Sequence, residues 1–206
     1  MKLRIKLCGL KNHKEIEIAC KYGVYAIGLV FVQHSVRKVT IHRAKSLCLS
    51  ALPLVQLVGV FMNPTKQFVN QVIRSVPLNM LQFHGIEREA FCKSFSLPYL
   101  KSIPINSVGW KGIARFIKLY PSASGFLIDS HKANQMGGTG TISEWEQVPK
   151  SIQHKLILSG GIHVKNIIKA HLQTGITQFD ISSGIESSRG VKDTRKIVAL
   201  LRHSLK

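Results

Sequence analysis

The stretch Phe126-Leu-Ile-Asp129-Ser130 leads into a polar loop, residues 131–135, and then into the glycine cluster Met136-Gly-Gly-Thr-Gly140. Three apolar residues that run directly into an acid are typical of a short strand buried on both faces, as in a parallel sheet. Asp129 then lies where the strand leaves the core. Ligands bind at the carboxyl ends of parallel strands, so this carboxylate is a candidate for chemistry; a helix-capping or loop-bracing Asp is the alternative.

Outward from this stretch, an alternation of strand and helix repeats about eight times. Predicted strands occupy residues 3–9, 25–31, 54–61, 80–85, 99–103, 125–129, 155–158 and 178–181. Predicted helices occupy residues 11–22, 41–52, 63–76, 87–94, 107–120, 164–173 and 191–203, with a weak helical turn near residues 144–145. Short strands that alternate with helices require parallel pairing through right-handed crossovers. The pattern predicts an α/β fold in which residues 1–206 form a single (β/α)8 TIM barrel domain; an open doubly wound sheet rarely has eight strands at this length.

The charge is the most unusual feature of the composition. Twenty-nine Lys and Arg against 10 Asp and Glu give a formal net charge of +19. Such a charge indicates an anionic binding partner: nucleic acid, an acidic membrane surface or a phosphorylated small molecule. The basic residues do not form a block, and several are predicted on solvent-exposed outer helix faces: Lys165, Lys169, Lys192, Arg195, Lys196 and Arg202. Nucleic-acid binding would require clustered cations interleaved with exposed aromatics, but aromatics make up only 7% and fall mostly inside predicted strands. We therefore expect no nucleic-acid partner.

The four cysteines (Cys8, Cys20, Cys48 and Cys92) form neither a C-x-x-C pair nor a metal-ligand spacing. The basic start of the chain is not followed by the apolar segment of an export signal, and no run approaches the ~18 apolar residues of a membrane span. These features predict a cytoplasmic protein with no membrane association.

In a barrel of this kind, functional groups lie at the carboxyl ends of the strands. The side chains and turns predicted there are Cys8, Gln82, His84, Asp129, Ser159-Gly-Gly161, Asp180 and Ser182-Ser-Gly184. The glycine-rich ends of strands seven and eight predict a phosphate cradle built from backbone N–H groups. A phosphosugar ligand follows from the two motifs together, since either alone is an ordinary glycine turn.

Cys8 and Asp129 form a candidate acid–base pair. A strand Cys is commonly a small buried hydrophobe, but strands one and six are three steps apart around the ring, which places the two groups across the mouth from each other. One group can deprotonate a substrate carbon while the other protonates an oxygen. This requires a thiol pKa below its free value of ~8.5 and a carboxyl pKa above ~3.9. Nothing in the sequence identifies the group that would lower the thiol pKa.

The motifs resemble, in order and spacing, those of phosphoribosylanthranilate isomerases over nearly the whole chain. They are Lys6-Leu-Cys8-Gly9, Ala26-Ile-Gly-Leu-Val-Phe31, Gln82-Phe-His84-Gly85, Asp129-Ser130, Gly137-Gly-Thr-Gly140, Leu158-Ser-Gly-Gly161 and Phe179-Asp-Ile-Ser-Ser-Gly-Ile-Glu186. The resemblance implies an Amadori rearrangement in tryptophan biosynthesis without cofactor or metal, on a small phosphosugar substrate, by a monomer or homodimer.

The resemblance also implies roles for individual residues. Asp129 is similar to the general acid that protonates the furanose ring oxygen, and Cys8 to the general base that takes the proton from sugar C2. Arg37 would bind the anthranilate carboxylate, Asp180 would position the anthranilate amine, and His84 would line the site. The residues that match the phosphate site are Gly160, Gly161, Ser183 and Gly184; Gly138, Thr139 and Gly140 match the glycine loop after strand six.

Three loops depart from the family pattern. His34-Ser-Val-Arg37 stands where Ser-Pro-Arg is usual, Thr141-Ile-Ser-Glu-Trp145 lacks a basic residue, and Ser187-Ser-Arg-Gly190 replaces a Pro-Gly turn. None of these changes touches the proposed acid or base, so we expect them to alter affinity more than activity.

Three alternatives stay open. A histidine-pathway aminoaldose isomerase would use two strand-end aspartates from similar halves, whereas this chain has Cys8 in the first of those positions and shows no clear half-repeat. A basic nucleic-acid-binding protein accounts only for the charge. A catalytically inactive barrel conflicts with the intact Cys8, Asp129 and glycine motifs.

Overall fold

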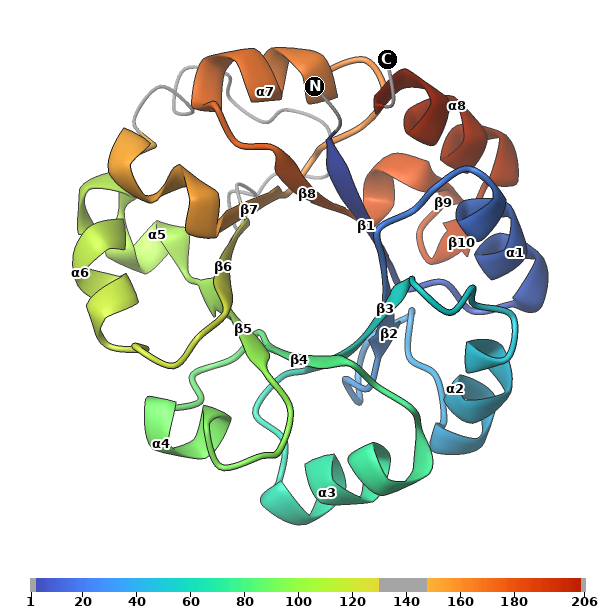
Figure 1. Cartoon of the computed structure of the whole chain (residues 1–206), viewed down its shortest axis with the longest axis horizontal. Helices are drawn as coiled ribbons and strands as arrows, with labels where there is room; N and C mark the ends of the chain where they lie inside the picture. Colours follow the sequence, from blue (N-terminus) through green and yellow to red (C-terminus); the bar gives the residue numbers. More distant parts are fainter. Residues whose placement is uncertain (1–2, 130–147, 205–206) are drawn as a thin grey trace.

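The structure, a computed structural model, describes residues 3–129 and 148–204, and its eight parallel strands close into a barrel in sequential order (Figure 1). The barrel strands are β1 Arg4–Cys8, β2 Ala26–Val30, β3 Gln56–Phe61, β4 Met80–Phe83, β5 Tyr99–Ile103, β6 Gly125–Asp129, β7 Leu156–Ser159 and β8 Gln178–Ile181. The (β/α)8 barrel predicted from the sequence is confirmed.

Helices form the outer ring, and α8 closes it beside α1 (Figure 1). They are α1 His13–Lys21, α2 Ile41–Cys48, α3 Lys66–Ser75, α4 Glu89–Cys92, α5 Ile105–Val108, α6 Ile113–Lys118, α7 Ile167–Thr174 and α8 Thr194–Ser204. Shorter 3₁₀ segments are η1 Trp110–Gly112, η3 Lys150–Lys155 and η4 Ser183–Ile185, and a two-stranded hairpin pairs β9 Glu186–Ser188 with β10 Val191–Lys192. None of the helices described is long and apolar enough to cross a membrane.

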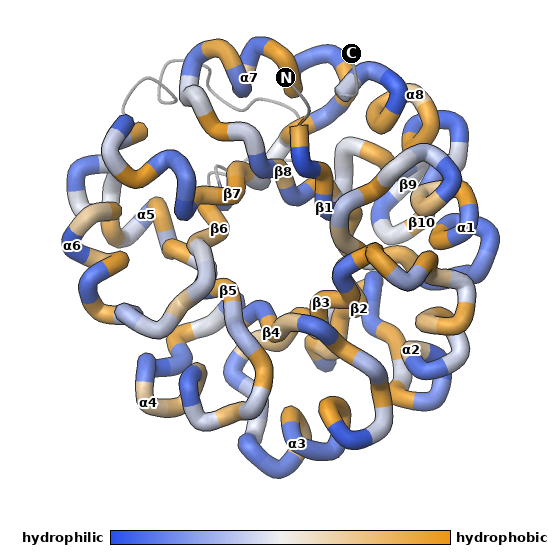
Figure 2. Tube along the Cα trace, in the orientation of Figure 1, coloured by the Kyte–Doolittle hydropathy of each residue, from blue (hydrophilic) through white to orange (hydrophobic). Residues whose placement is uncertain are grey.

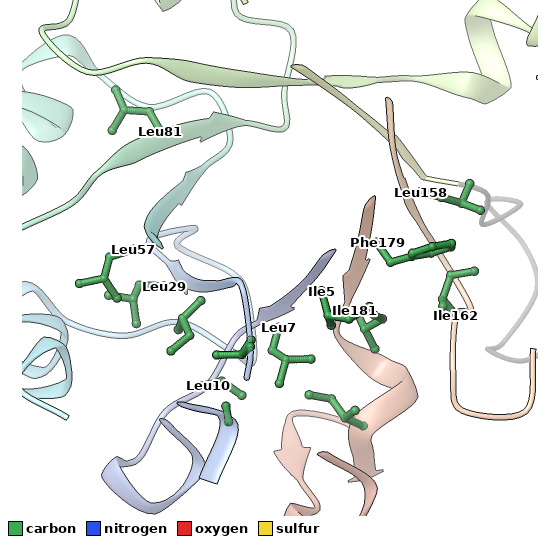
Figure 3. Packing of buried hydrophobic residues seen from close by; sticks show 14 of the residues in the cluster. Ile5, Leu7, Leu10, Leu29, Leu57, Leu81, Leu158, Ile162, Phe179 and Ile181 are labelled. Atoms are coloured by element: carbon green, nitrogen blue, oxygen red, sulfur yellow. The ribbon is translucent and has the colours of Figure 1, made fainter. Parts of the chain in front are cut away.

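Side-chain alternation along the strands separates the two parts of the core. In β1, Ile5 and Leu7 join the large apolar cluster that fills the space between strands and helices, together with residues such as Phe179 (Figure 3). Lys6 and Cys8 occupy the alternate positions, which face the barrel interior. Figure 2 shows hydrophobic residues on most of the strands, whereas the outer helices carry both hydrophobic and hydrophilic segments. A smaller cluster inside the barrel comprises Leu100, Leu127 and Ile157.

Local sequence signals fix the starts of the longer helices. Asn12 caps α1 in a capping box with Glu15. The Thr40 and Thr65 hydroxyls each accept a hydrogen bond from the backbone N–H of the third residue of their helix, α2 and α3 respectively.

Two predicted helices differ from the structure. The segment 107–120 is divided among the end of α5, η1 and α6, because Gly109 adopts φ +66° and ends α5. The last helix begins at Thr194 instead of residue 191, because Val191 and Lys192 pair with β9. Several other boundaries shift by a few residues: α2 ends at Cys48, β3 begins at Gln56, α3 begins at Lys66, α4 spans Glu89–Cys92, and α7 begins at Ile167.

The prediction that Lys192 lies on an exposed helix face was wrong. Its side chain is fully buried and its Nζ lies 2.8 Å from Glu186 Oε1. The other five basic residues predicted on outer faces are exposed: Lys165, Lys169, Arg195, Lys196 and Arg202. The helical turn predicted near residues 144–145 lies outside the described residues.

Candidate active site

A cavity of about 850 Å³ opens at the carboxyl ends of the strands. Its lining includes eight of the predicted site residues: Cys8, Arg37, His84, Asp129, Asp180, Gly160, Gly161 and Ser183. Gly184 is not among the lining residues, and Gly138, Thr139 and Gly140 lie outside the described residues. The fold therefore brings together side chains from strands far apart in the chain, at the end of the barrel where ligands bind.

Asp129 and His84 occupy one side of the cavity. Their nearest atoms, Asp129 Oδ2 and His84 Nε2, are 3.9 Å apart, and both side chains are about one-third exposed. Burial lowers the pKa of His84, an effect that the nearby carboxylates of Asp129 and Asp180 oppose. His84 is therefore a neutral imidazole near neutral pH, able to donate one hydrogen bond and accept another.

Cys8 lies across the cavity from Asp129, within a buried group of charges. Lys6 Nζ donates to Asp180 Oδ1 at 2.9 Å, and both side chains are nearly inaccessible to solvent. The pKa of the Cys8 thiol is raised, first by burial and also by the Asp180 carboxylate, while the cationic side chains of Lys6 and Lys192 act in the opposite direction. The sequence analysis could not identify the groups that lower the thiol pKa; in the structure these groups are Lys6 and Lys192.

Arg37 reaches the cavity from the loop after β2, where Glu186 holds it. Its Nε and Nη2 donate to the two carboxylate oxygens at 2.6 and 2.8 Å. Lys192 Nζ donates to Glu186 Oε1 at 2.8 Å and to the Ser182 carbonyl at 2.9 Å. Ser182 Oγ in turn donates to the Cys8 carbonyl at 3.1 Å. These bonds fix Arg37, the end of β8 and the end of β1 relative to one another.

The glycine-rich turns after β7 and β8 adjoin each other. Gly160 and Gly161 adopt φ +85° and +67°, a region that favours glycine. At Gly184 a Cβ would lie 1.9 Å from the Ile162 carbonyl oxygen, so only glycine lets the two turns approach this closely. Asn166 Nδ2 donates to the Gly161 carbonyl at 2.9 Å. The two motifs predicted as one phosphate cradle are adjacent in space.

A second buried ion pair lies behind the loop that carries His84. The Glu87 carboxylate accepts from Gly85 N at 3.0 Å and Asn63 N at 2.7 Å. Lys101 Nζ donates to Glu87 Oε2 at 3.0 Å and to the Gly85 carbonyl at 2.5 Å. This network sets the course of the chain directly after His84.

Sequence reasoning placed Gln82 at a strand end without a specific role, and it assigned no role in the site to Lys6, Lys192 or Glu186. The β1 alternation was a usable signal for Lys6, since residues two apart in a strand share a face. Gln82 lines the cavity and is buried, and its Oε1 accepts no hydrogen bond from the described part of the chain. Within residues 3–129 and 148–204, no three His, Cys, Asp or Glu side chains form a group that could hold a metal ion.

Comparisons with known proteins identify the family of the chain. The family model for N-(5'phosphoribosyl)anthranilate (PRA) isomerase matches residues 5–203. N-(5'-phosphoribosyl)anthranilate isomerase from Xanthomonas oryzae pv. oryzae is 40% identical over 198 residues, covering 94% of this chain and 89% of the relative. The enzyme of that name from Stutzerimonas stutzeri is 38% identical over 200 residues, covering 97% and 96%.

A solved structure shows the same architecture. Phosphoribosyl anthranilate isomerase from Thermotoga maritima superposes with a TM-score of 0.84 at 25% identity, and the match covers 98% of each chain. The matched family model, the curated relatives and this structure extend over nearly the entire length. The chain belongs to the N-(5'-phosphoribosyl)anthranilate isomerase family.

Proposed function

We propose that this protein converts N-(5'-phosphoribosyl)anthranilate into 1-(o-carboxyphenylamino)-1-deoxyribulose 5-phosphate, as its family membership indicates. The observation that carries the proposal is that Cys8 and Asp129, from strands β1 and β6, line one cavity together with two adjacent glycine turns. A proton donor, a proton acceptor and a set of backbone N–H groups are the parts that this isomerisation of a phosphosugar needs.

In the proposed mechanism, Asp129 protonates the furanose ring oxygen, and the C1–O bond breaks to give an iminium between C1 and the anthranilate nitrogen. Cys8 then takes the proton from C2 as a thiolate, and the C2–H electron pair neutralises the iminium. The resulting enaminol tautomerises to the ketone. Because the iminium accepts the electrons, the proton transfers assigned to the two side chains complete the redox-neutral rearrangement.

Binding is assigned to the groups around this pair. Arg37, held by Glu186, is placed to meet the anthranilate carboxylate, and Asp180 to orient the anthranilate amine. The phosphate is assigned to the turns that contain Gly160, Gly161, Ser183 and Gly184. Neutral His84 lines the wall beside Asp129.

We further propose that residues 1–206 act as one catalytic domain in the cytoplasm, as a monomer or a homodimer. Light scattering across a range of protein concentrations measures the oligomeric state; a larger assembly would contradict this part of the proposal.

The test is the rate of isomerisation of freshly generated phosphoribosylanthranilate, followed by the loss of its fluorescence. We expect activity in the wild type and losses of about two orders of magnitude or more in Cys8→Ser and in Asp129→Asn. Cys20→Ser, on the outer helix α1, is the matched control and should keep wild-type activity.

Two results would overturn the assignment. An inactive wild type that still binds the reduced product would favour the related aminoaldose substrate of histidine biosynthesis. A wild type that neither turns over nor binds would leave the glycine turns as scaffold.

A further inference from the structure

Lys6 and Cys8 share one small space inside the barrel. The two residues are two positions apart on β1, so both side chains face the barrel interior. Gly28 on β2 is the strand partner of Cys8. A Cβ on Gly28 would lie 2.9 Å from Cys8 Sγ and also 2.9 Å from Lys6 Nζ. The missing side chain of Gly28 is therefore what allows the ammonium and the sulfur to lie side by side.

The same ammonium also faces a carboxylate. Lys6 Nζ lies 2.9 Å from Asp180 Oδ1, and the pair is buried. Burial alone would lower the pKa of Lys6, but Asp180 and then Cys8 hold it above its ordinary value. Lys6 is therefore a permanent buried cation placed between two groups that can each carry a negative charge.

The charges around Cys8 do not balance when the thiol is protonated. The groups that face it are Lys6 on β1, Asp180 on β8, Lys192 on β10 and Arg37 after β2. Glu186 is the shared partner of Arg37 and Lys192. Three cations thus stand against two carboxylates, and a thiolate at Cys8 would make the group neutral. Buried charges favour such compensation.

We propose that Lys6 is the positioning residue that favours the thiolate form of Cys8 against the effect of burial, and that Asp180 competes with the thiolate for the Lys6 ammonium. The inference deepens the proposed function, on which it rests, because a thiolate is the form of Cys8 that can accept the C2 proton. Lys6 itself acts only through Cys8. Its charge explains how a thiol buried by the barrel can serve as a base.

The test compares two variants that differ only at residue 6: Asp180→Asn and the double variant Lys6→Met/Asp180→Asn. Both lack the Asp180 charge, and the double variant contains no unpaired buried ion from this pair, which protects the fold. Iodoacetamide alkylation of Cys8 is measured from about pH 6 to about pH 10 by peptide mass spectrometry, since only the thiolate displaces iodide. All four cysteines are buried, but only Cys8 lines the cavity; Cys20, Cys48 and Cys92 belong to the apolar core around the barrel and serve as internal references.

We expect Cys8 of the double variant to react about tenfold more slowly than Cys8 of Asp180→Asn near neutral pH, with a titration midpoint about one pH unit or more higher. The midpoint of the wild type should fall between the two, and Lys6→Arg should remain near the wild type. At high pH the rates of all variants should converge, because reagent access is unchanged.

Equal midpoints in Asp180→Asn and the double variant would overturn the inference. A rate difference that persists at high pH would also overturn it, since that result reports access instead of ionisation. Alkylation requires no turnover, so an inactive wild type with the expected order of midpoints would remove the proposed function and leave the Lys6–Cys8 relationship intact.

Discussion

The Arg37 guanidinium donates two parallel hydrogen bonds to the Glu186 carboxylate, 2.6 Å from Nε and 2.8 Å from Nη2, although the two residues are 149 positions apart in the sequence. Such fork-to-fork pairing fixes the plane of the guanidinium as well as its position. The loop after β2 lacks the usual proline, and this pair supplies a tertiary restraint on the same loop. Arg37 is thereby held at the cavity rim before any ligand arrives.

Glu186 should make stability depend on acid pH. Burial raises its pKa, but hydrogen bonds from Arg37 and Lys192 outweigh that effect and hold the pKa at about 2. Because the folded pKa lies below the unfolded value of ~4.3, the stabilisation is present above that value and is lost as pH falls toward 2. Urea unfolding should show wild type most stable relative to Glu186→Gln above about pH 5, with the difference shrinking toward pH 2. Exposed Glu17→Gln is the control and should change stability little; a Glu186→Gln difference that is constant with pH would contradict the assignment.

Gly184→Ala should weaken phosphate binding. The added Cβ would meet the Ile162 carbonyl at 1.9 Å, so the turns after β7 and β8 would have to separate. We expect KM to rise by about tenfold or more while the acid and base stay in place. Gly109→Ala is the control, because its Cβ would meet nothing within 4 Å and only the positive φ is strained. Equal KM values in Gly184→Ala and wild type would show that these turns do not hold the phosphate.

Removing Lys101 should destabilise the fold more than removing the whole ion pair. Lys101→Met leaves the Glu87 carboxylate buried without its cation, a change that typically costs about 3–5 kcal/mol. In Lys101→Met/Glu87→Gln no unpaired charge is left, so the loss should be smaller. Chemical denaturation measures both values, and a double variant less stable than Lys101→Met would refute this account.

The positive surface should speed substrate capture. The substrate carries a phosphate and a carboxylate, and the net charge of +19 gives long-range attraction that salt screens over ~8 Å at physiological ionic strength. We expect kcat/KM to fall several-fold between about 10 mM and about 300 mM salt, with kcat nearly constant. A kcat/KM that does not change with ionic strength would show that the charge serves another purpose.

The sequence predicted the strands well because each is a short apolar run ended by a polar or glycine residue, a signal that is local. It also placed Cys8, His84, Asp129 and Asp180 at strand ends, and the closed barrel then brings them to one cavity. What it could not predict depends on contacts distant in sequence or on unusual backbone geometry. Lys192 looks like a surface residue until the hairpin folds it onto Glu186, and the helix over 107–120 looks continuous until Gly109 turns to positive φ.

The outer ring is uneven, and this has a consequence for local stability. The helices α1 and α8, next to the strand that carries Cys8, have nine and 11 residues. By contrast, α4 and α5, which follow β4 and β5, have four residues each (Figure 1). Short helices bury less apolar area and open at lower free energy. Amide hydrogens of β4 and β5 should therefore exchange with deuterium faster than those of β1 and β8. The Cys8 thiol would then lie in the slowly exchanging half of the barrel, and the His84 imidazole in the half that opens locally more often.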